Sequence, residues 1–282
     1  MHHHLSKLSP ILNLIFGGCN ALYLMSNLPG IVHVRRLYHK TRFFHGGGDY
    51  VRFWGAFETA EAARKHLADE CPSNYAEADL TEVNRESFLQ VHLFDYPIIF
   101  WLNKIQGEYK SLIDFGGHIG VKYYAYEKFL PHLQGINWTV VEVPFAVERG
   151  RKEASERGAS NLTFSDSLDN KQCDVLFISG AMQYASKSIG ELLDSMHSFP
   201  RLIILNKLPV HLGADLYTLE NFGNAKIHYR IFNKDNFDEL LHRRGFRKID
   251  TWTIPSREIT IPFAEEQVKK MEMQGQVWER IL

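Results

Sequence analysis

A glycine-rich segment that follows an acidic residue has the clearest chemical meaning in this sequence. Residues 112–120 read LIDFGGHIG, so an apolar run reaches Asp114 and glycines follow. Glycines at a strand-to-helix turn permit positive φ angles and let a ligand approach the backbone closely. Asp114 can accept a hydrogen bond from an ammonium group of that ligand, directly or through water. We predict that four residues of the turn contact the ligand: Gly116, Gly117, His118 and Gly120.

Two further acids follow apolar runs and are suited to the rest of a nucleotide. The run that begins at Trp138 ends at Glu142, and a carboxylate offers two oxygens that can accept both hydroxyls of a ribose. Asp166 comes shortly after the run Leu162–Phe164 and can accept a hydrogen bond from the exocyclic amine of adenine. We therefore predict that Glu142 binds a ribose and that Asp166 binds an adenine.

A loop of small residues follows the next apolar run, Val175–Ser179. Ser179 and Gly180 begin this loop, which would face both the ligand and a second substrate. The carboxyl ends of parallel strands meet at one edge of a sheet, and ligands bind in the crevice there. Sites for an ammonium group, a ribose and an adenine in this order predict S-adenosylmethionine as the ligand.

Two other interpretations of the glycines remain open at this point. A nicotinamide-binding domain also has a glycine-rich turn, but its G-x-G-x-x-G spacing is missing here because position 118 is His. Alternatively, the glycines serve only tight strand-to-helix turns in an α/β domain that binds no nucleotide.

Short apolar runs alternate with amphipathic stretches after Gly107, which is typical of βαβ units and a parallel sheet. Strands are expected at Ser111–Phe115, Trp138–Val143, Leu162–Phe164, Val175–Ser179 and Leu202–Leu205. Helices are expected at Val121–Leu133, Phe145–Arg157, Ile189–Ser198 and Asn236–Arg244. Two more strand-like runs follow, at Lys248–Ile254 and Glu258–Pro262.

The segment before this alternating region is predicted to be mainly helical. Thr59 is a suitable N-cap for a helix that begins near Phe57, and apolar residues recur at helical spacing from Asn84 through Trp101. We therefore expect four parts: an apolar N-terminal helical segment (1–45), a helical cap (46–107), the ligand-binding domain (108–265) and a C-terminal helix (266–282).

The N-terminal segment is unusual because no Asp, Glu, Lys or Arg occurs from Leu8 to His33. A basic cluster follows it: Arg35, Arg36, His39, Lys40 and Arg42. Such a helix can lie in a membrane interface, with the basic cluster meeting anionic lipid. It can equally be buried against the main domain or a partner subunit. Both interpretations stay open.

The composition of the chain argues against a nucleic-acid-binding protein, a disulfide-rich protein and a zinc protein. With 282 residues and a formal net charge of −1, the chain has no overall positive field to attract nucleic acid, so we expect no nucleic-acid partner. Its three cysteines, Cys19, Cys71 and Cys173, are too few and too widely spaced for a disulfide framework or a zinc site. This cysteine content fits a reducing compartment. We expect a cytoplasmic protein, with the inner face of the membrane as a second possibility.

The chain resembles a group of bacterial methyltransferases associated with surface-polysaccharide gene clusters. The resemblance runs from Trp54 through Trp252, and four pieces carry it: Asp114-Phe115-Gly116-Gly117 with Gly120, Trp138–Glu142, Ser179–Tyr184, and Gly245-Phe246 with Trp252. It implies a Rossmann-like class I methyltransferase sheet, mostly parallel with the last strand antiparallel, behind an N-terminal helical extension. It also implies S-adenosylmethionine as cofactor and a sugar or glycan precursor as acceptor. His118 departs from the wider superfamily, which has a glycine there.

Methyl transfer to an alcohol requires in-line alignment and removal of a proton. Three residues are candidates for the catalytic group: His211 after the fifth strand, His228 before the last helix, and Tyr184. Arg230 could hold a phosphate or carboxylate of the acceptor. No metal-ligand spacing is present in the sequence, so we expect metal-independent transfer.

Three functional hypotheses follow. The first is an S-adenosylmethionine-dependent enzyme that O-methylates a sugar or glycan precursor in surface-polysaccharide biosynthesis. The second is a non-catalytic protein of the same fold that acts as an assembly or regulatory module. The third is an oxidoreductase that uses a nicotinamide cofactor.

Overall fold

The computed structural model describes residues 28–45, 52–68, 71–72, 85–223, 225–255, 257–265 and 270–281. The chain divides into two compact units, residues 1–52 and 53–282. In the first unit, helix α2 (Pro29–His45) carries the basic cluster that follows the uncharged segment. Most of that uncharged segment lies outside the described residues. Within the described part of the chain, no helix combines the length and the apolar character needed to cross a membrane.

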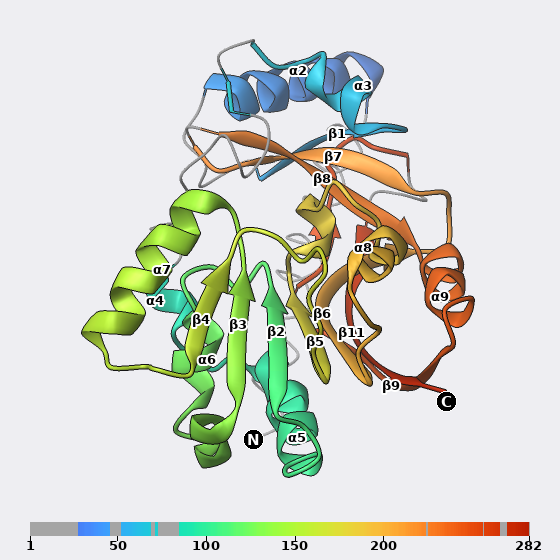
Figure 1. Cartoon of the computed structure of the whole chain (residues 1–282). Helices are drawn as coiled ribbons and strands as arrows, with labels where there is room; N and C mark the ends of the chain where they lie inside the picture. Colours follow the sequence, from blue (N-terminus) through green and yellow to red (C-terminus); the bar gives the residue numbers. More distant parts are fainter. Residues whose placement is uncertain are drawn as a thin grey trace, which may run out of the picture. The chain divides into compact units, whose positions relative to one another are not determined.

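The second unit contains a mostly parallel sheet. Its parallel strands are β2 (Ser111–Phe115), β3 (Asn137–Val141), β4 (Leu162–Ser165), β5 (Val175–Ser179) and β6 (Leu202–His211). Strand β11 (Lys270–Arg280) pairs antiparallel with both β6 and β9 (Phe246–Thr253). The resulting order is β4-β3-β2-β5-β6-β11-β9 (Figure 1). An antiparallel last strand inserted before the sixth is the class I methyltransferase arrangement, so the predicted fold class is confirmed.

Three antiparallel strands extend this sheet beyond the carboxyl ends of the parallel strands (Figure 1). They are β1 (Phe53–Phe57), β7 (Leu216–Asn221) and β8 (Lys226–Asn233). Strand β8 joins β6 through two parallel pairs, Val210 with Phe232 and His211 with Asn233. None of these strands was expected from the sequence, and β1 lies in the segment predicted to be a helical cap.

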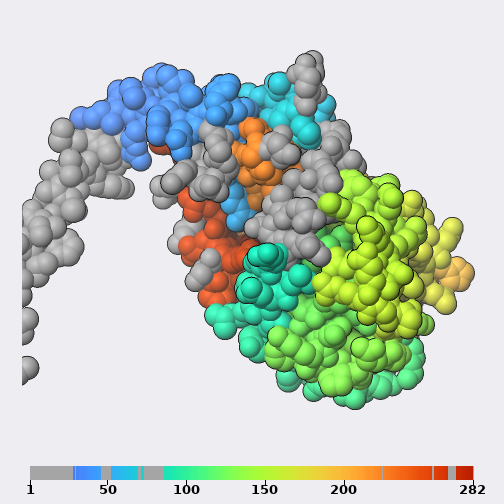
Figure 2. Space-filling view, turned by 90° about the vertical axis from the view of Figure 1, so that its left-hand side faces the viewer, coloured from blue at the N-terminus to red at the C-terminus, as the bar shows by residue number. Residues whose placement is uncertain are grey.

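Helices cover both faces of the parallel strands. Helices α5 (Tyr96–Lys104), α6 (Val121–Tyr126) and α7 (Pro144–Glu156) share one buried core with Leu112 and Val140. In the space-filling view the part of the chain that contains these helices, coloured teal to yellow-green, forms one continuous surface (Figure 2). Helices α8 (Ile189–Ser195) and α9 (Lys234–His242) share the core on the other face with Ile113 and Leu176. Parallel strands buried on both faces read as continuous apolar runs, which is why they were predictable.

The expected helix from Asn84 through Trp101 is broken. It consists of α4 (Arg85–Phe88), the 3-10 helix η1 (Leu93–Asp95) and α5. The Asp95 carboxylate accepts a hydrogen bond from the backbone N–H of His92 at 2.9 Å, which fixes a new helix start at η1. The helix expected at Val121–Leu133 likewise ends at Tyr126, and the 3-10 helix η2 (Pro131–Gly135) follows it. Thr59 does cap α3 (Ala60–Arg64), as predicted.

The C-terminal helix expected at residues 266–282 is wrong, because residues 270–280 form strand β11. Polar and apolar residues alternate from Lys270 to Gln274, but Gln276, Val277 and Trp278 are all fully buried, so the alternation does not continue through the middle of the strand. A side chain at Gly275 would come within 2.0 Å of the Trp252 ring, so the strand needs a glycine there. Of the two strand-like runs near the end, Lys248–Thr253 lies in β9, and β10 (Ile259–Thr260), in the second run, pairs antiparallel with β11.

Candidate functional site

The glycine-rich turn joins β2 to α6 at the carboxyl edge of the parallel strands. Gly116 has φ +71° and Gly120 has φ +85°, values that glycine adopts without a steric penalty. A Cβ atom added to Gly116 would lie 2.2 Å from Cβ of Ala181, in the loop after β5. The turn after β2 and the loop after β5 are therefore in direct contact.

Asp114 lies beneath this turn. Only 1% of its surface is exposed, and a Cβ atom added to Gly117 would come 2.4 Å from its Oδ2. Among the described residues, Oδ2 of Asp114 has no hydrogen-bond partner. Burial raises the pKa of Asp114 to about 7, and the indole N–H of Trp138 opposes this rise. A buried carboxylate that lacks a partner is costly, and a ligand ammonium group would provide one.

Glu142 directly follows β3, and its side chain is hydrogen-bonded to the glycine-rich turn. Its Oε1 accepts from the backbone N–H of His118 at 3.2 Å, and its Oε2 accepts from the backbone N–H of Val143 at 2.8 Å. Burial raises the pKa of Glu142, and these two hydrogen bonds act in the opposite direction. Each carboxylate oxygen has a second lone-pair direction, so the side chain keeps capacity for two ligand hydroxyls.

The remaining predicted cofactor residues lie at neighbouring strand ends. Ser179 and Gly180 stand at the carboxyl end of β5, and the Gly180 carbonyl accepts from Nε2 of Gln183 at 2.9 Å. Asp166 follows β4 and is exposed. The turn, Glu142 and the loop after β5 thus come together at one edge, with Asp166 exposed beyond β4.

The three predicted catalytic candidates are not brought together. Tyr184, in the 3-10 helix η3 (Met182–Tyr184), donates a hydrogen bond to Glu220 at 2.5 Å and packs edge-on against Tyr229. His228 precedes Tyr229 in β8, and successive strand residues point to opposite faces, so His228 faces away from Tyr184. His211 shares a hydrogen bond of 2.6 Å with the carbonyl of Ala214.

Arg230, considered from the sequence as an anion-binding group, has a partner inside the fold. Its guanidinium forms an ion pair with Asp215, with Nη2 at 2.5 Å and Nε at 3.0 Å from Oδ2. The Asp215 carboxylate also accepts from the backbone N–H of Asn233 at 2.6 Å. This pair joins the start of β7 to the end of β8.

Lys207 is a residue of this site that was not singled out from the sequence. It directly follows Asn206, whose partner across the sheet is Ser179, and it has φ +55° inside the long strand β6. A Cβ atom added to Gly180 would lie 3.1 Å from Nζ of Lys207. Burial lowers the pKa of Lys207 to about 7. A lysine two residues after the apolar run Leu202–Leu205 was the available signal.

A buried ion pair lies nearby. Asp95, which is fully buried, accepts from Nζ of Lys122 at 2.8 Å and from the hydroxyl of Tyr126 at 2.7 Å. Burial lowers the pKa of Lys122 and raises that of Tyr126. Nζ of Lys122 and Nζ of Lys207 lie 5.7 and 5.5 Å from the centre of the Phe94 ring. The sequence could not reveal this pair, since its partners lie on separate elements.

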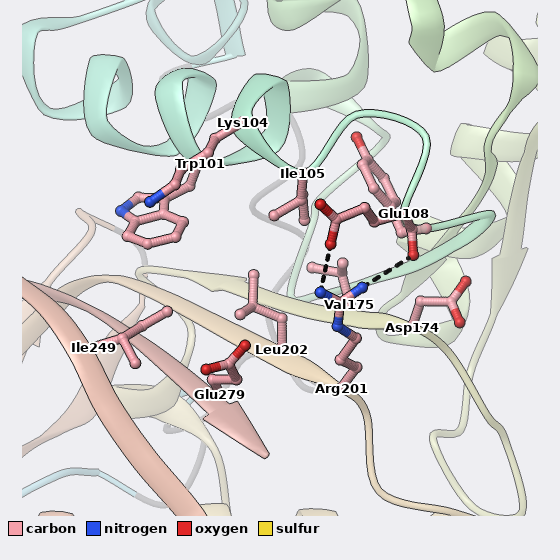
Figure 3. A pocket seen from close by; sticks show the side chains of 11 residues that line it. Trp101, Lys104, Ile105, Glu108, Asp174, Val175, Arg201, Leu202, Ile249 and Glu279 are labelled. Atoms are coloured by element: carbon pink, nitrogen blue, oxygen red, sulfur yellow. Dashed lines mark hydrogen bonds and ion pairs between the residues drawn. The ribbon is translucent and has the colours of Figure 1, made fainter. Parts of the chain in front are cut away.

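A cavity of about 350 Å³ lies at the opposite, amino-terminal edge of the sheet, beneath the end of α5 (Figure 3). Arg201 forms an ion pair with Glu108 at its mouth. Asp174 accepts from the backbone N–H groups of Lys110 and Ser111 at 2.7 and 2.9 Å, which fixes the start of β2. These charged side chains have partners within the fold. Ligands of open α/β sheets bind at the other edge, where the glycine-rich turn lies.

No protein-family model matches this sequence, and no curated protein sequence matches it. The structure is similar to the N-terminal domain of EvdMO1, solved in the presence of SAH and D-fucose, at 12% identity over 67% of this chain and 84% of that chain, with a TM-score of 0.47. It is similar to the glycopeptide N-methyltransferase MtfA complexed with S-adenosyl-L-homocysteine, at 14% identity over 80% and 100%, TM-score 0.47. It is also similar to 1,6-didemethyltoxoflavin-N1-methyltransferase of Burkholderia thailandensis, at 17% identity over 70% and 83%, TM-score 0.45.

Proposed function

We propose that this protein is an S-adenosylmethionine-dependent methyltransferase. One observation carries the proposal: the turn after β2 has two consecutive glycines, Gly116 and Gly117, and two carboxylates flank it, Asp114 beneath it and Glu142 hydrogen-bonded to it. This turn stands at the carboxyl edge of a sheet with the class I methyltransferase strand order.

The residues present fit this cofactor. Glycine is required at positions 116 and 117, because an added Cβ atom would meet Ala181 or the Asp114 carboxylate, so the turn packs directly onto both residues. Oδ2 of Asp114 lacks a partner among the described residues and matches an ammonium group. Glu142 retains acceptor capacity for ribose hydroxyls. When bound, the cofactor supplies a methyl group activated by a positively charged sulfur.

The chain has to orient the acceptor and accommodate its proton. We assign the acceptor space to the side of Gly180 where η3 and β7 meet. There the hydroxyl of Tyr184 donates to the buried carboxylate of Glu220, so its oxygen can accept a hydrogen bond from an acceptor hydroxyl. Alignment of nucleophile, methyl carbon and sulfur then accounts for much of the rate enhancement.

For the acceptor we propose a hydroxyl of a sugar or glycan precursor, so that the reaction is O-methylation in surface-polysaccharide biosynthesis. The resemblance of the sequence to methyltransferases of polysaccharide gene clusters supports this choice. Aromatic and carboxylate side chains together, as at Tyr184 and Glu220, suit a hydroxyl-rich ring.

A nicotinamide-dependent oxidoreductase fits the sheet less well. Dinucleotide-binding sheets have the strand order 3-2-1-4-5-6 with a sixth parallel strand next to the fifth. Here the antiparallel strand β11 lies between β6 and β9. His118 in the glycine-rich turn is a second departure from that fingerprint.

The proposal is tested by methyl transfer from radiolabelled S-adenosylmethionine to a bacterial glycan extract. We expect label to enter the glycan fraction with wild-type protein, and the Glu142→Ala variant to lose both this transfer and affinity for S-adenosylhomocysteine. Binding without transfer on any glycan fraction would contradict the acceptor assignment. Failure of folded wild-type protein to bind S-adenosylhomocysteine would contradict the proposed function itself.

A further inference from the structure

Asp114 and Lys207 carry opposite formal charges on two sides of the glycine-rich turn. Resting on the proposed function, we infer that these two residues form one site for the zwitterionic amino-acid end of the cofactor. Asp114 accepts a hydrogen bond from the ammonium group, and Lys207 donates one to the carboxylate.

A short chain of contacts links the turn above Asp114 to Lys207. The position of Gly116 abuts Ala181, and the position of Gly180 abuts the ammonium of Lys207. The ring of Phe88, in α4, lies near both loops: its centre is 6.0 Å from the centre of the His118 ring and 5.5 Å from Nζ of Lys207. The turn, Gly180 and Lys207 therefore lie close together at the carboxyl edge of the sheet, with Phe88 near both the turn and Lys207.

Each group keeps hydrogen-bonding capacity in the part of the chain that the structure describes, although the indole N–H of Trp138 acts on the Asp114 carboxylate. Oδ2 of Asp114 accepts no hydrogen bond there. The contacts of the Lys207 ammonium are the faces of Phe88 and Phe94, each 5.5 Å from Nζ. Lys122 differs, because Asp95 neutralises it at 2.8 Å. A carboxylate oxygen without a hydrogen bond and an ammonium without a countercharge at hydrogen-bond distance, both at one edge, match a ligand that carries both charges on adjacent groups.

Neighbouring charged groups shift the pKa values of both Asp114 and Lys207. Lys122 and Arg257 disfavour the protonated form of Lys207, whereas Asp95 and Asp114 favour it. Glu142 disfavours the ionised form of Asp114, whereas Lys122 and Lys207 favour it. In the protein without ligand, the pKa values of Asp114 and Lys207 are both about 7, so each group is half neutral near that pH.

A bound zwitterion therefore lowers the pKa of Asp114 and raises that of Lys207. Below pH 7 the protein must release a proton from Asp114 to bind, and above pH 7 it must take one up at Lys207. Affinity for the amino-acid end is then greatest near pH 7 and falls on both sides. A ligand without the amino-acid end has no such dependence.

The test compares two ligands by calorimetry: S-adenosylhomocysteine, and 5′-methylthioadenosine, which keeps the adenosine and the sulfur but has no amino-acid end. We expect Lys207→Met and Asp114→Asn each to weaken S-adenosylhomocysteine binding by about 10- to 100-fold, the range of a hydrogen bond to a charged group. Binding of 5′-methylthioadenosine stays within about twofold of wild type. Lys207→Arg retains part of the affinity, because it keeps the charge.

Lys152→Met is the matched control, since it removes one positive charge from an exposed position on α7 and leaves both affinities unchanged. Thermal unfolding shows that each variant is folded. The inference is overturned if Lys207→Met leaves S-adenosylhomocysteine binding intact, as it would if Lys207 were only the base for the acceptor, or if it weakens both ligands equally. If folded wild-type protein binds neither ligand, the proposed function fails instead.

Discussion

Glu142 and His118 are joined by a hydrogen bond of 3.2 Å from the backbone N–H of His118 to the Glu142 carboxylate. This bond ties the end of β3 to the turn after β2. It holds the turn in a conformation in which His118 itself has φ +58°, a region where residues other than glycine are uncommon. The acid proposed to bind ribose is thus also the residue that shapes the turn.

The positive φ angle of His118 restricts which residues can replace it. A β-branched residue is strongly disfavoured at positive φ, so His118→Val should lower the free energy of unfolding by about 1–2 kcal/mol. His118→Gly should stay within about 0.5 kcal/mol of wild type, because glycine adopts this φ readily. Urea denaturation of both variants measures the difference. Equal stabilities would show that the turn is not held at positive φ.

Gly117 should not tolerate a side chain. The added Cβ atom of Gly117→Ala would meet the Asp114 carboxylate at 2.4 Å, so we expect S-adenosylhomocysteine binding to fall by at least about tenfold. Gly135→Ala is the control. Gly135 lies in η2, and a Cβ atom added there would have no other heavy atom within 4 Å. Calorimetry should show weaker S-adenosylhomocysteine binding for Gly117→Ala than for Gly135→Ala. Equal affinities of the two variants would show that the ligand binds elsewhere.

Asp114 should reduce the stability of the protein at neutral pH. Its folded-state pKa of about 7 exceeds its usual value of 3.8, so the folded state binds more protons and the free energy of unfolding falls as pH rises from about 4 to 7. Asp114→Asn removes this ionisation and should be more stable than wild type by about 2–4 kcal/mol at pH 8. Denaturation at pH 5 and pH 8 tests this, and a gap that does not widen at pH 8 would contradict it.

The buried pair of Asp95 and Lys122 should respond asymmetrically to substitution. Asp95→Asn leaves a buried ammonium without its countercharge and should cost about 3–5 kcal/mol of stability. The double variant with Lys122→Met should lose less than the sum of the two single variants, because neither charge is left unpaired. A double-mutant cycle by denaturant unfolding measures this coupling. Strict additivity would show that the two charges do not interact.

The sequence was sufficient for the parallel half of the sheet and for its turn. Strands β2 and β5 begin and end where the apolar runs predicted, because both faces are buried and most of their residues are apolar. The glycine-rich turn was recognisable because its conformation demands particular residues locally.

The rest depended on partners that are distant along the chain. Strand β11 was mistaken for a helix because its centre, around Gln276, is buried between β6 and β9 and shows no alternation. Strands β7 and β8 form a sheet with β1, which precedes them by some 160 residues, as the bond from Thr218 Oγ1 to the Trp54 carbonyl illustrates. Lys207 could not be recognised as a binding residue from the sequence, because its neighbours Gly180 and Phe88 are distant along the chain.

A crystal structure of the protein with S-adenosylhomocysteine tests the central claim most directly. The account predicts ligand density along Gly116 and Gly117, with the ammonium group within hydrogen-bond distance of Asp114 and the ribose hydroxyls on Glu142. Density at another place, such as the cavity beneath the end of α5, would contradict it. So would crystals that contain no ligand after soaking at saturating concentration.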